Sequence, residues 1–178
     1  TSDTYNGWID LFGWSTSATN FGVSTSDSNR SYSGSFVDWG INKIGNDAPN
    51  TWRTLTKDEW DYLLTYRNNA NILKGIARVN GVNGLIILPD NWKTPQGITF
   101  KPRFHHEQSI EAYRQHQTLT AEQWAILEQS GAIFLPAAVS RIGTVVNSIP
   151  TYGHYWTSTI DDGFTRCHFY LYSNEAGV

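Results

Sequence analysis

The sequence feature that most constrains the fold is a nine-residue pattern that occurs twice. Residues 55–63 and residues 119–127 both follow Leu-Thr-x-x-(Glu/Gln)-Trp-x-x-Leu. A threonine with Glu or Gln three positions later is typical of a capping box, in which each side chain accepts the other residue's backbone N–H at a helix start. The tryptophan and the last leucine have the spacing of one helix face. We therefore predict two capped helices, over about residues 56–67 and 121–129, each with a buried tryptophan.

Apolar segments after each of these helices predict strands. Residues 85–89 and 132–136 are short apolar runs that end in Leu-Pro. The first run is apolar on both faces, so it is expected to be a central strand. Residues 76–80 alternate as a strand does, and Asn83 with Gly84 is expected to form the hairpin turn before the central strand.

The C-terminal region predicts a second hairpin. Residues 152–159 and 165–173 are rich in β-forming residues and flank residues 160–164, which contain an Asp-Gly turn signal. Two sets alternate along the second run, namely Cys167, Phe169 and Leu171 in one and Arg166, His168, Tyr170 and Tyr172 in the other. We expect the first set to face the core and the second to face solvent. Arg, His and Tyr combine contact area with hydrogen bonding, as a small recognition surface requires. The alternative, that Tyr and Arg merely suit an exposed strand, stays open.

Length, charge and cysteine content limit the classes of protein. A chain of 178 residues is expected to form a single domain over residues 1–178. With a net charge of -3 and 16% charged residues, it lacks the basic footprint of a nucleic-acid-binding protein. No run of 18 apolar residues could span a bilayer, and residues 1–30 lack the features of a signal peptide. A single cysteine excludes an internal disulfide framework.

Aromatic content favours a binding module over a metabolic enzyme. Aromatic residues make up 14% of the chain, with 8 Trp, alongside 15 Gly. Such chains use aromatic side chains to hold long irregular segments on a modest core. Residues 1–50 show little periodicity: the apolar residues 8–14 are expected to pack on the core, and residues 15–35 are expected to form a Ser/Thr/Asn/Gly-rich loop.

Motifs in chain order resemble those of a known family. They are Gly-Trp-Ile-Asp-Leu-Phe-Gly-Trp at 7–14, Trp-Arg-Thr-Leu-Thr at 52–56 with Glu-Trp at 59–60, Val-Asn-Gly-Val-Asn-Gly at 79–84, Leu-Pro-Asp-Asn-Trp at 88–92, Phe-Leu-Pro-Ala-Ala at 134–138, Arg-Ile-Gly at 141–143 and Gly-His-Tyr-Trp-Thr-Ser-Thr at 153–159. The chain is similar, over about residues 5–172, to the Fibrobacter succinogenes major paralogous domain family, whose relatives abound in gut Bacteroidetes. The resemblance implies an α+β, C-type-lectin-like fold, with two helices packed on small antiparallel sheets and with long loops.

Two departures from that family concern its terminal strands. Family members carry a strand before the motif at residues 7–14 and a closing strand after the tyrosine-rich hairpin, and neither has an obvious counterpart here. Such terminal strands pair with each other, so we expect a piece of a longer polypeptide or a domain completed by another chain. The open sheet edge would suit a partner chain or self-assembly. Some proteins of this kind are targets of diversity-generating retroelements near the C-terminal end, which the resemblance permits here.

Signals for catalysis or metal binding are weak. The wider fold group includes the formylglycine-generating enzyme, which needs a cysteine pair, whereas this chain has only Cys167, on a face expected to be buried. Calcium-lectin motifs do not occur, and residues 90–91 and 161–162 suit turns better than calcium ligation. The densest cluster of metal-binding residue types is His105, His106, Glu107, Glu111 and His116. It lacks His-Glu-x-x-His spacing and is expected to be a solvated loop or short helix. We expect no cofactor, no metal and no catalytic residue.

These observations predict a non-enzymatic recognition and adhesion module, secreted or at the cell surface, that binds a glycan or protein without membrane insertion. The expected ligand-binding residues are His154, Tyr155, Ile160, Asp161, Phe164, Arg166, His168, Tyr170 and Tyr172. The expected scaffold residues are Trp60, Trp124, Leu88 and Leu135. The alternative is a structural or assembly domain of a surface appendage or phage virion. An enzyme related to the formylglycine-generating fold is the third interpretation.

Overall fold

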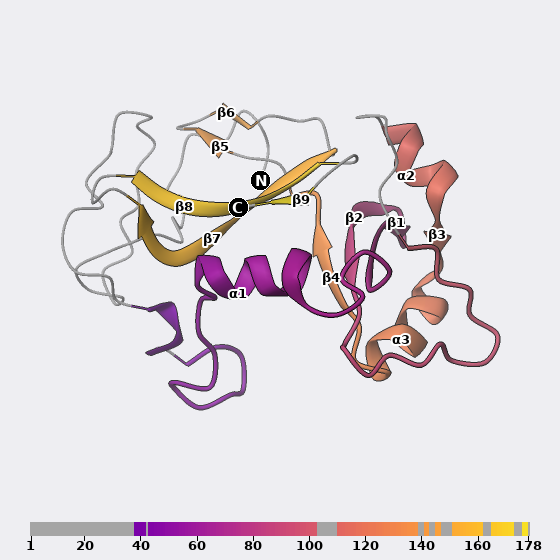
Figure 1. Cartoon of the computed structure of the whole chain (residues 1–178), viewed down its shortest axis with the longest axis horizontal. Helices are drawn as coiled ribbons and strands as arrows, with labels where there is room; N and C mark the ends of the chain where they lie inside the picture. The colour runs from indigo at the N-terminus through magenta and orange to yellow at the C-terminus, as the bar shows by residue number, and fades with distance from the viewer. Residues whose placement is uncertain are drawn as a thin grey trace. The chain divides into compact units, whose positions relative to one another are not determined.

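The computed structural model describes residues 38–41, 43–102, 110–138, 141–142, 145–146, 151–161, 165–172 and 176–177 (Figure 1). The chain divides into two compact units. Unit 1 comprises Thr1–Lys57, Ser140–Ser148 and Trp156–His168, and unit 2 comprises Asp58–Val139, Ile149–Tyr155 and Phe169–Val178. The apolar segment 8–14 and the loop 15–35 of the sequence prediction lie outside the described residues.

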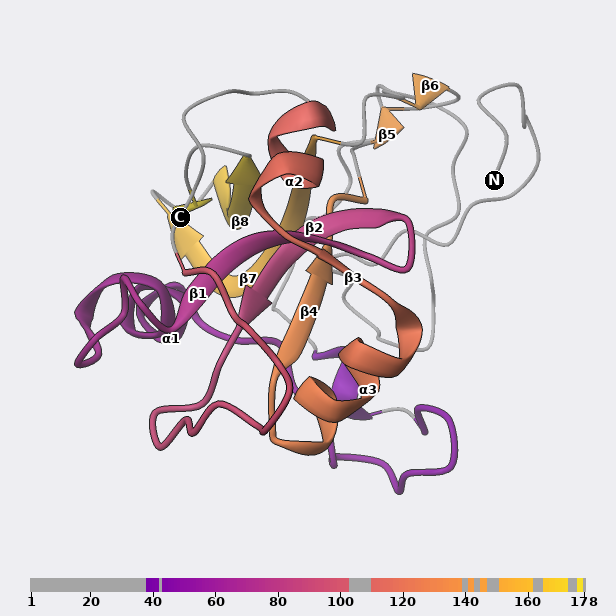
Figure 2. The same cartoon turned by 90° about the vertical axis from the view of Figure 1, so that its right-hand side faces the viewer.

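Unit 2 contains a four-stranded mixed sheet with the strand order β3-β1-β2-β4 (Figure 2). Its strands are β1 (Lys74–Val79), β2 (Val82–Ile87), β3 (Thr118–Leu119) and β4 (Ile133–Pro136). Strand β2 pairs antiparallel with both β1 and β4, whereas β3 pairs parallel with β1. The prediction of a central strand is therefore confirmed, and Leu85 and Ile86 within it are fully buried. Together with the helices, this sheet gives the chain the mixed α+β content that was expected.

The turn between β1 and β2 corrects one prediction. Asn80 and Gly81 form the two-residue connection, and both have positive φ, 45° and 85°. A type I′ hairpin turn requires positive φ at both central residues. The prediction that Asn83 and Gly84 form this turn is wrong, because both lie inside β2. Two Asn-Gly pairs three positions apart carry the same local signal, so sequence alone could not choose between them.

Packing against β4 explains why the second glycine belongs in the sheet. A Cβ atom on Gly84 would lie 2.4 Å from the Leu135 carbonyl oxygen and 2.5 Å from the Phe134 ring. Only glycine therefore allows β2 and β4 to approach as they do. The adjacent Asn83 is buried, with 3% of its surface exposed.

The first predicted helix changes its geometry halfway along. Helix α1 (Lys57–Asp61) continues directly into a π-helical segment, η2 (Tyr62–Tyr66), which the sequence did not predict. The expected end near Arg67 is confirmed, and Trp60 and Leu64 are buried as expected. Within unit 1, the backbone N–H of Lys57 donates to Thr159 Oγ1 at 3.0 Å. A hydroxyl from a distant strand thus satisfies one of the free N–H groups at this helix start.

The second predicted helix has the cap and the bounds that were predicted for it. Helix α3 (Ala121–Gln129) begins with a complete capping box: Thr120 N–H donates to Gln123 Oε1 at 3.0 Å, and Gln123 N–H donates to Thr120 Oγ1 at 3.2 Å. It ends before Gly131, whose φ is 92°. Trp124 is only partly buried, against the expectation, and its ring lies 5.7 Å from that of Phe134.

A third helix supplies core that the sequence prediction missed. Helix α2 (Ile110–His116) lies where a solvated loop or short helix was expected, and its Ala112 and Tyr113 are fully buried. The hydroxyl of Tyr113 donates to the Thr151 carbonyl at 2.9 Å. The main apolar cluster of unit 2 consists of Leu73, Ala77, Val79, Ile86, Leu88, Ile98, Leu119, Leu127 and Ala132. The short helix is therefore held by burial rather than solvated.

The remaining described elements include the C-terminal strands. They are the 3₁₀ turn η1 (Trp39–Ile41), the pair β5 (Arg141–Ile142) and β6 (Val145–Val146), and a three-stranded sheet of β7 (Tyr152–Asp161), β8 (Thr165–Tyr172) and β9 (Ala176–Gly177). The predicted strand pair is confirmed, but β7 extends through Ile160 and Asp161, which were expected in the turn. Strand β9 pairs antiparallel with β8, although no strand after the hairpin was evident from the sequence.

Candidate functional site

The residues predicted to bind a ligand lie on or beside strands β7 and β8. Arg166, His168, Tyr170 and Tyr172 occupy every second position of β8. Alternate positions of a strand share one face of the sheet. Ile160 and Asp161 end β7, and Phe164 lies outside the described residues. The strand assignment thus agrees with the alternation on which the prediction was based.

Two of the predicted residues have described side chains, His154 and Tyr155. The Tyr155 hydroxyl donates to the Pro136 carbonyl, and burial raises the pKa of Tyr155 above its ordinary value. This hydroxyl is therefore engaged within unit 2. His154 is half-buried, and its ring meets that of Tyr152 edge-on at 5.6 Å and 77°. Glycine suits position 153 because a Cβ there would lie 2.9 Å from the Pro136 carbonyl oxygen.

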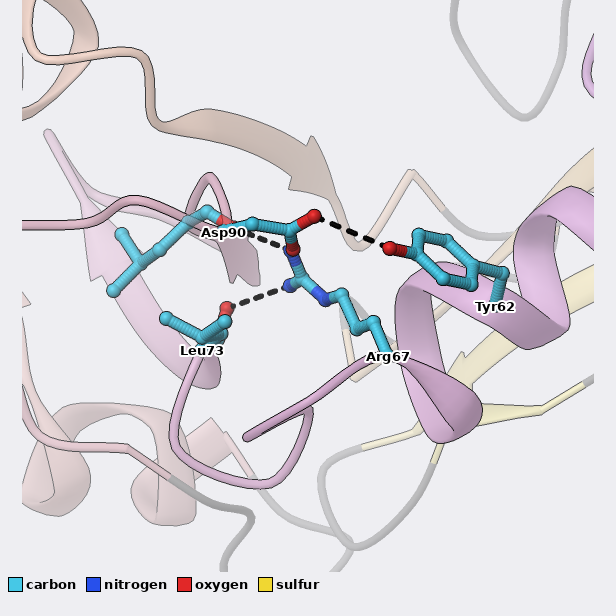
Figure 3. Close-up of polar contacts among 5 residues, drawn as sticks. Tyr62, Arg67, Leu73 and Asp90 are labelled. Atoms are coloured by element: carbon cyan, nitrogen blue, oxygen red, sulfur yellow. Dashed lines mark hydrogen bonds and ion pairs between the residues drawn. The ribbon is translucent and has the colours of Figure 1, made fainter.

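A buried arginine is the centre of a polar cluster in unit 2 (Figure 3). Arg67 has only 4% of its surface exposed. Its Nη1 donates to the Leu88 carbonyl at 2.7 Å and to Asp90 Oδ1 at 3.0 Å, and its Nη2 donates to the Leu73 carbonyl at 3.2 Å. The guanidinium therefore joins the end of η2 to the chain before β1 and to the chain after β2.

The carboxylate of Asp90 completes this cluster at the surface. One oxygen pairs with Arg67, and the other accepts the Tyr62 hydroxyl at 3.2 Å. Its side chain remains 61% exposed. Both oxygens are thus engaged by the fold, which supports a structural role rather than calcium ligation for this residue. Figure 3 shows Tyr62 reaching from the helix toward Asp90.

A half-buried lysine, Lys74, lies near this arginine. The Lys74 ammonium donates to the Leu64 carbonyl. Burial lowers the pKa of Lys74 from its ordinary value, and the nearby charge of Arg67 lowers it further. Two cations thus share one half-buried region and are held there mainly by main-chain carbonyls.

A shallow cavity of about 300 Å³ adjoins this cluster. Its lining residues are Leu63, Arg67, Ile87, Leu88, Pro89, Asp90, Gly131 and Ile133. The walls are mainly apolar, and Nη1 and Nη2 of Arg67 are already bonded to main-chain carbonyls and to Asp90. The arrangement holds these segments of unit 2 together.

The predicted cluster of metal-binding residue types is only partly described. Residues 105–107 lie outside the described residues. Glu111 bonds Arg114 at 3.1 Å and Gln115 at 3.3 Å, and His116 Nε2 lies 3.0 Å from the Lys101 carbonyl oxygen. Among the residues that the structure describes, no group of three or more His, Cys, Asp or Glu could hold a metal ion.

Comparison with protein families, with characterised proteins and with solved structures gave no match to this chain. No helix in the described parts of the chain is long and apolar enough to cross a membrane.

Sequence reasoning missed the arginine cluster. The only local signal was Arg67 itself, which follows Leu63 and Leu64 at the spacing of the buried helix face. A charged residue at such a position usually indicates a buried partner, because an unpaired buried charge is too costly. The partners of Arg67 lie further along the chain, between Leu73 and Asp90. The spacing of residues within the helix could therefore not identify them.

Proposed function

We propose that this chain is a non-enzymatic recognition module with a C-type-lectin-like fold, secreted or at the cell surface. It would bind a glycan or a protein through the face of the β7–β8 hairpin. The single observation that supports this proposal is the alternation of Arg166, His168, Tyr170 and Tyr172 along the eight residues of β8.

The chemistry of these side chains supports recognition rather than catalysis. Tyrosine offers a large, rigid surface on which a sugar ring or an apolar side chain can stack, and its hydroxyl bonds at low cost in conformational entropy. Arginine and histidine add donors that can select a carbonyl or carboxylate. A twisted sheet holds such side chains at fixed spacing, so little ordering is required when a ligand binds.

A binding screen against glycan arrays and whole cells tests this proposal. We expect saturable binding by the purified chain and at least a tenfold loss of affinity in a Tyr170→Ala/Tyr172→Ala variant, because hot-spot tyrosines contribute about 2 kcal/mol or more each. The matched control is Tyr66→Ala, which removes a tyrosine that is 75% exposed on η2. Equal binding by the double variant and the control would exclude the hairpin as the binding face. A parallel measurement with a chelator tests for calcium dependence.

The second candidate is an assembly domain whose contacts are all with copies of itself or with other parts of an appendage or virion. One observation favours it: Ile133, on the edge strand β4 of the four-stranded sheet, is 47% exposed. Exposed apolar edge residues are typical of strands that pair with another chain. A folded, self-associating protein that binds no glycan and no cell would support assembly over recognition.

A further inference from the structure

The tripeptide Val-Asn-Gly occurs twice in succession, at residues 79–81 and 82–84. Asparagine before glycine is chemically labile, because the backbone nitrogen of the next residue can attack the side-chain amide carbon and glycine has no Cβ to hinder the attack. The two asparagines, Asn80 and Asn83, have the same residue before them and the same residue after them. A large difference between their reactivities in the folded chain would therefore come from the fold.

The first pair lies in the exposed turn between β1 and β2. Asn80 and Gly81 are both exposed, and their φ angles are 45° and 85°. The ladder of paired residues ends at Val79 and Val82, so the peptide unit between Asn80 and Gly81 lies outside it. A Cβ built on Gly81 meets no atom within 4 Å, so there is open space on that side of the turn. This peptide unit can therefore rotate until the Gly81 nitrogen faces the Asn80 side chain, without displacing packed atoms.

The second pair lies inside β2 and is enclosed by its neighbours. Asn83 has 3% of its surface exposed, and its carbonyl accepts the Ala137 N–H at 2.7 Å. Gly84 is paired with Ala77 on one side and with Pro136 on the other. Rotation of the peptide unit between Asn83 and Gly84 would break these contacts. We therefore expect Asn83 to react only when the sheet opens locally.

We propose that Asn80 is a site of spontaneous modification, which converts it to aspartate and isoaspartate. The Gly81 nitrogen forms a bond to the Asn80 side-chain carbon, loses its proton and expels ammonia, which leaves a cyclic succinimide. Water then adds to either carbonyl carbon of the ring and breaks the C–N bond at that carbon. Cleavage at the side-chain carbon gives aspartate, and cleavage at the main-chain carbon gives isoaspartate. The overall change takes up a water molecule and releases ammonia, with no oxidation or reduction.

Isoaspartate at position 80 changes the turn more than aspartate does. Aspartate keeps the length of the backbone and tolerates positive φ as asparagine does, whereas isoaspartate adds a methylene to the main chain. A two-residue type I′ turn matches the twist of its strands, and a lengthened backbone does not. The Asn80 N–H also donates to the Leu119 carbonyl at 2.9 Å, which joins the turn to β3. Formation of isoaspartate should therefore weaken both the β1–β2 hairpin and its pairing with β3.

Incubation of the purified chain at mildly alkaline pH, followed by tryptic peptide mapping, tests the proposal. Both asparagines fall in one tryptic peptide, residues 79–93, so fragment masses compare the two sites in the same molecule. We expect Asn80 in the folded chain to be converted at least about tenfold faster than Asn83, since Asn83 must wait for the sheet to open. Each rate is compared with that of the same site in denaturant, where identical tripeptides should react alike. Equal rates at both sites of the folded chain would overturn the proposal, as would no conversion of Asn80 while the denatured chain reacts.

The Asn80→Asp variant separates the effect of charge from that of the lengthened backbone. It reproduces the aspartate product and lacks the amide that is attacked, so it should release no ammonia at this position. We expect it to unfold at nearly the wild-type temperature, because Asp-Gly also suits a type I′ turn. The isoaspartate form, separated by chromatography, should unfold at a lower temperature. Equal unfolding temperatures for that form and the variant would contradict the proposed effect on the hairpin. The modification does not depend on ligand binding by the β7–β8 face.

Discussion

At the scale of single residues, Arg67 shows how one charged side chain stabilises three segments of unit 2. Its bonds to the carbonyls of Leu73 and Leu88 are buried, whereas its partner Asp90 is 61% exposed. We predict that Arg67→Met lowers the free energy of unfolding by about 3–5 kcal/mol, since it leaves buried carbonyls without a donor. Asp90→Asn should cost less than about 1 kcal/mol, because exposed ion pairs contribute little. Urea unfolding measures both changes. Equal losses would indicate that the ion pair, and not the carbonyl bonds, dominates.

Tyr113 provides a test of pH dependence at the same scale. Burial raises the pKa of the Tyr113 hydroxyl above its ordinary value of about 10, and the neighbouring Tyr155 adds to the effect. The unfolded chain therefore loses this proton first, so the stability due to this hydroxyl is complete below pH 10 and falls above it. The expected slope is about 1.4 kcal/mol per pH unit.

The matched variant for this prediction is Tyr113→Phe. At neutral pH it should lower the free energy of unfolding by about 1–2 kcal/mol, because the Thr151 carbonyl loses its donor. Between pH 10 and pH 11 the difference from wild type should shrink, since only the wild type carries this buried ionisable group. Urea unfolding at several alkaline pH values measures both profiles. Parallel profiles would contradict the assignment of the raised pKa to Tyr113.

At the scale of elements, the two glycines of the β1–β2 hairpin are required for different reasons: Gly81 for its backbone conformation and Gly84 for close packing. Gly84→Ala should lower the free energy of unfolding by about 2–3 kcal/mol, because its Cβ would meet the Leu135 carbonyl at 2.4 Å and force β2 away from β4. Gly81→Ala should cost about 1 kcal/mol, since its positive φ is strained for alanine but the space is open. Thermal unfolding of both variants measures the difference. A larger loss of stability for Gly81→Ala than for Gly84→Ala would show that the turn conformation matters more than the packing of β2 on β4.

The cap of α3 gives a second prediction for an element. Thr120→Ala removes the hydroxyl that accepts the Gln123 N–H. It should lower the free energy of unfolding by about 1 kcal/mol, as N-cap replacements do. The same hydroxyl is the first cause of the lowered pKa of Glu122, so this carboxyl should titrate closer to its ordinary value in the variant. Chemical-shift titration of Glu122 follows the second effect, and an unchanged titration would exclude the hydroxyl as its cause.

Local signals predicted the elements whose determinants lie within a few residues of one another. The capping box of α3, the central strand β2 and the β7–β8 strand pair are of this kind. The turn at Asn80, the burial of Tyr113 and the carbonyl contacts of Arg67 depend on partners far along the chain, which spacing does not reveal. That Arg166, His168, Tyr170 and Tyr172 share one exposed face stays a prediction from strand alternation.

At the scale of the whole molecule, the edge strands of the sheet allow a prediction of the oligomeric state. In the described sheet of unit 2, the edge strands β3 and β4 have two and four residues. Short edge strands limit pairing with other chains. We therefore predict a monomer, measured as the mass of one chain by size-exclusion chromatography with light scattering at several concentrations.

Two variants, each with a lysine in place of an exposed isoleucine, test whether β4 pairs with another chain. Ile133→Lys places a charge on β4, and Ile126→Lys places one at a similarly exposed position, 41% exposed, on α3. A monomeric wild type should give the same mass as both variants. A larger wild-type species that Ile133→Lys dissociates, while Ile126→Lys does not, would identify β4 as an assembly edge. Because edge pairing requires a free ladder of N–H and C=O groups on β4, that result would favour the assembly domain over the freestanding recognition module.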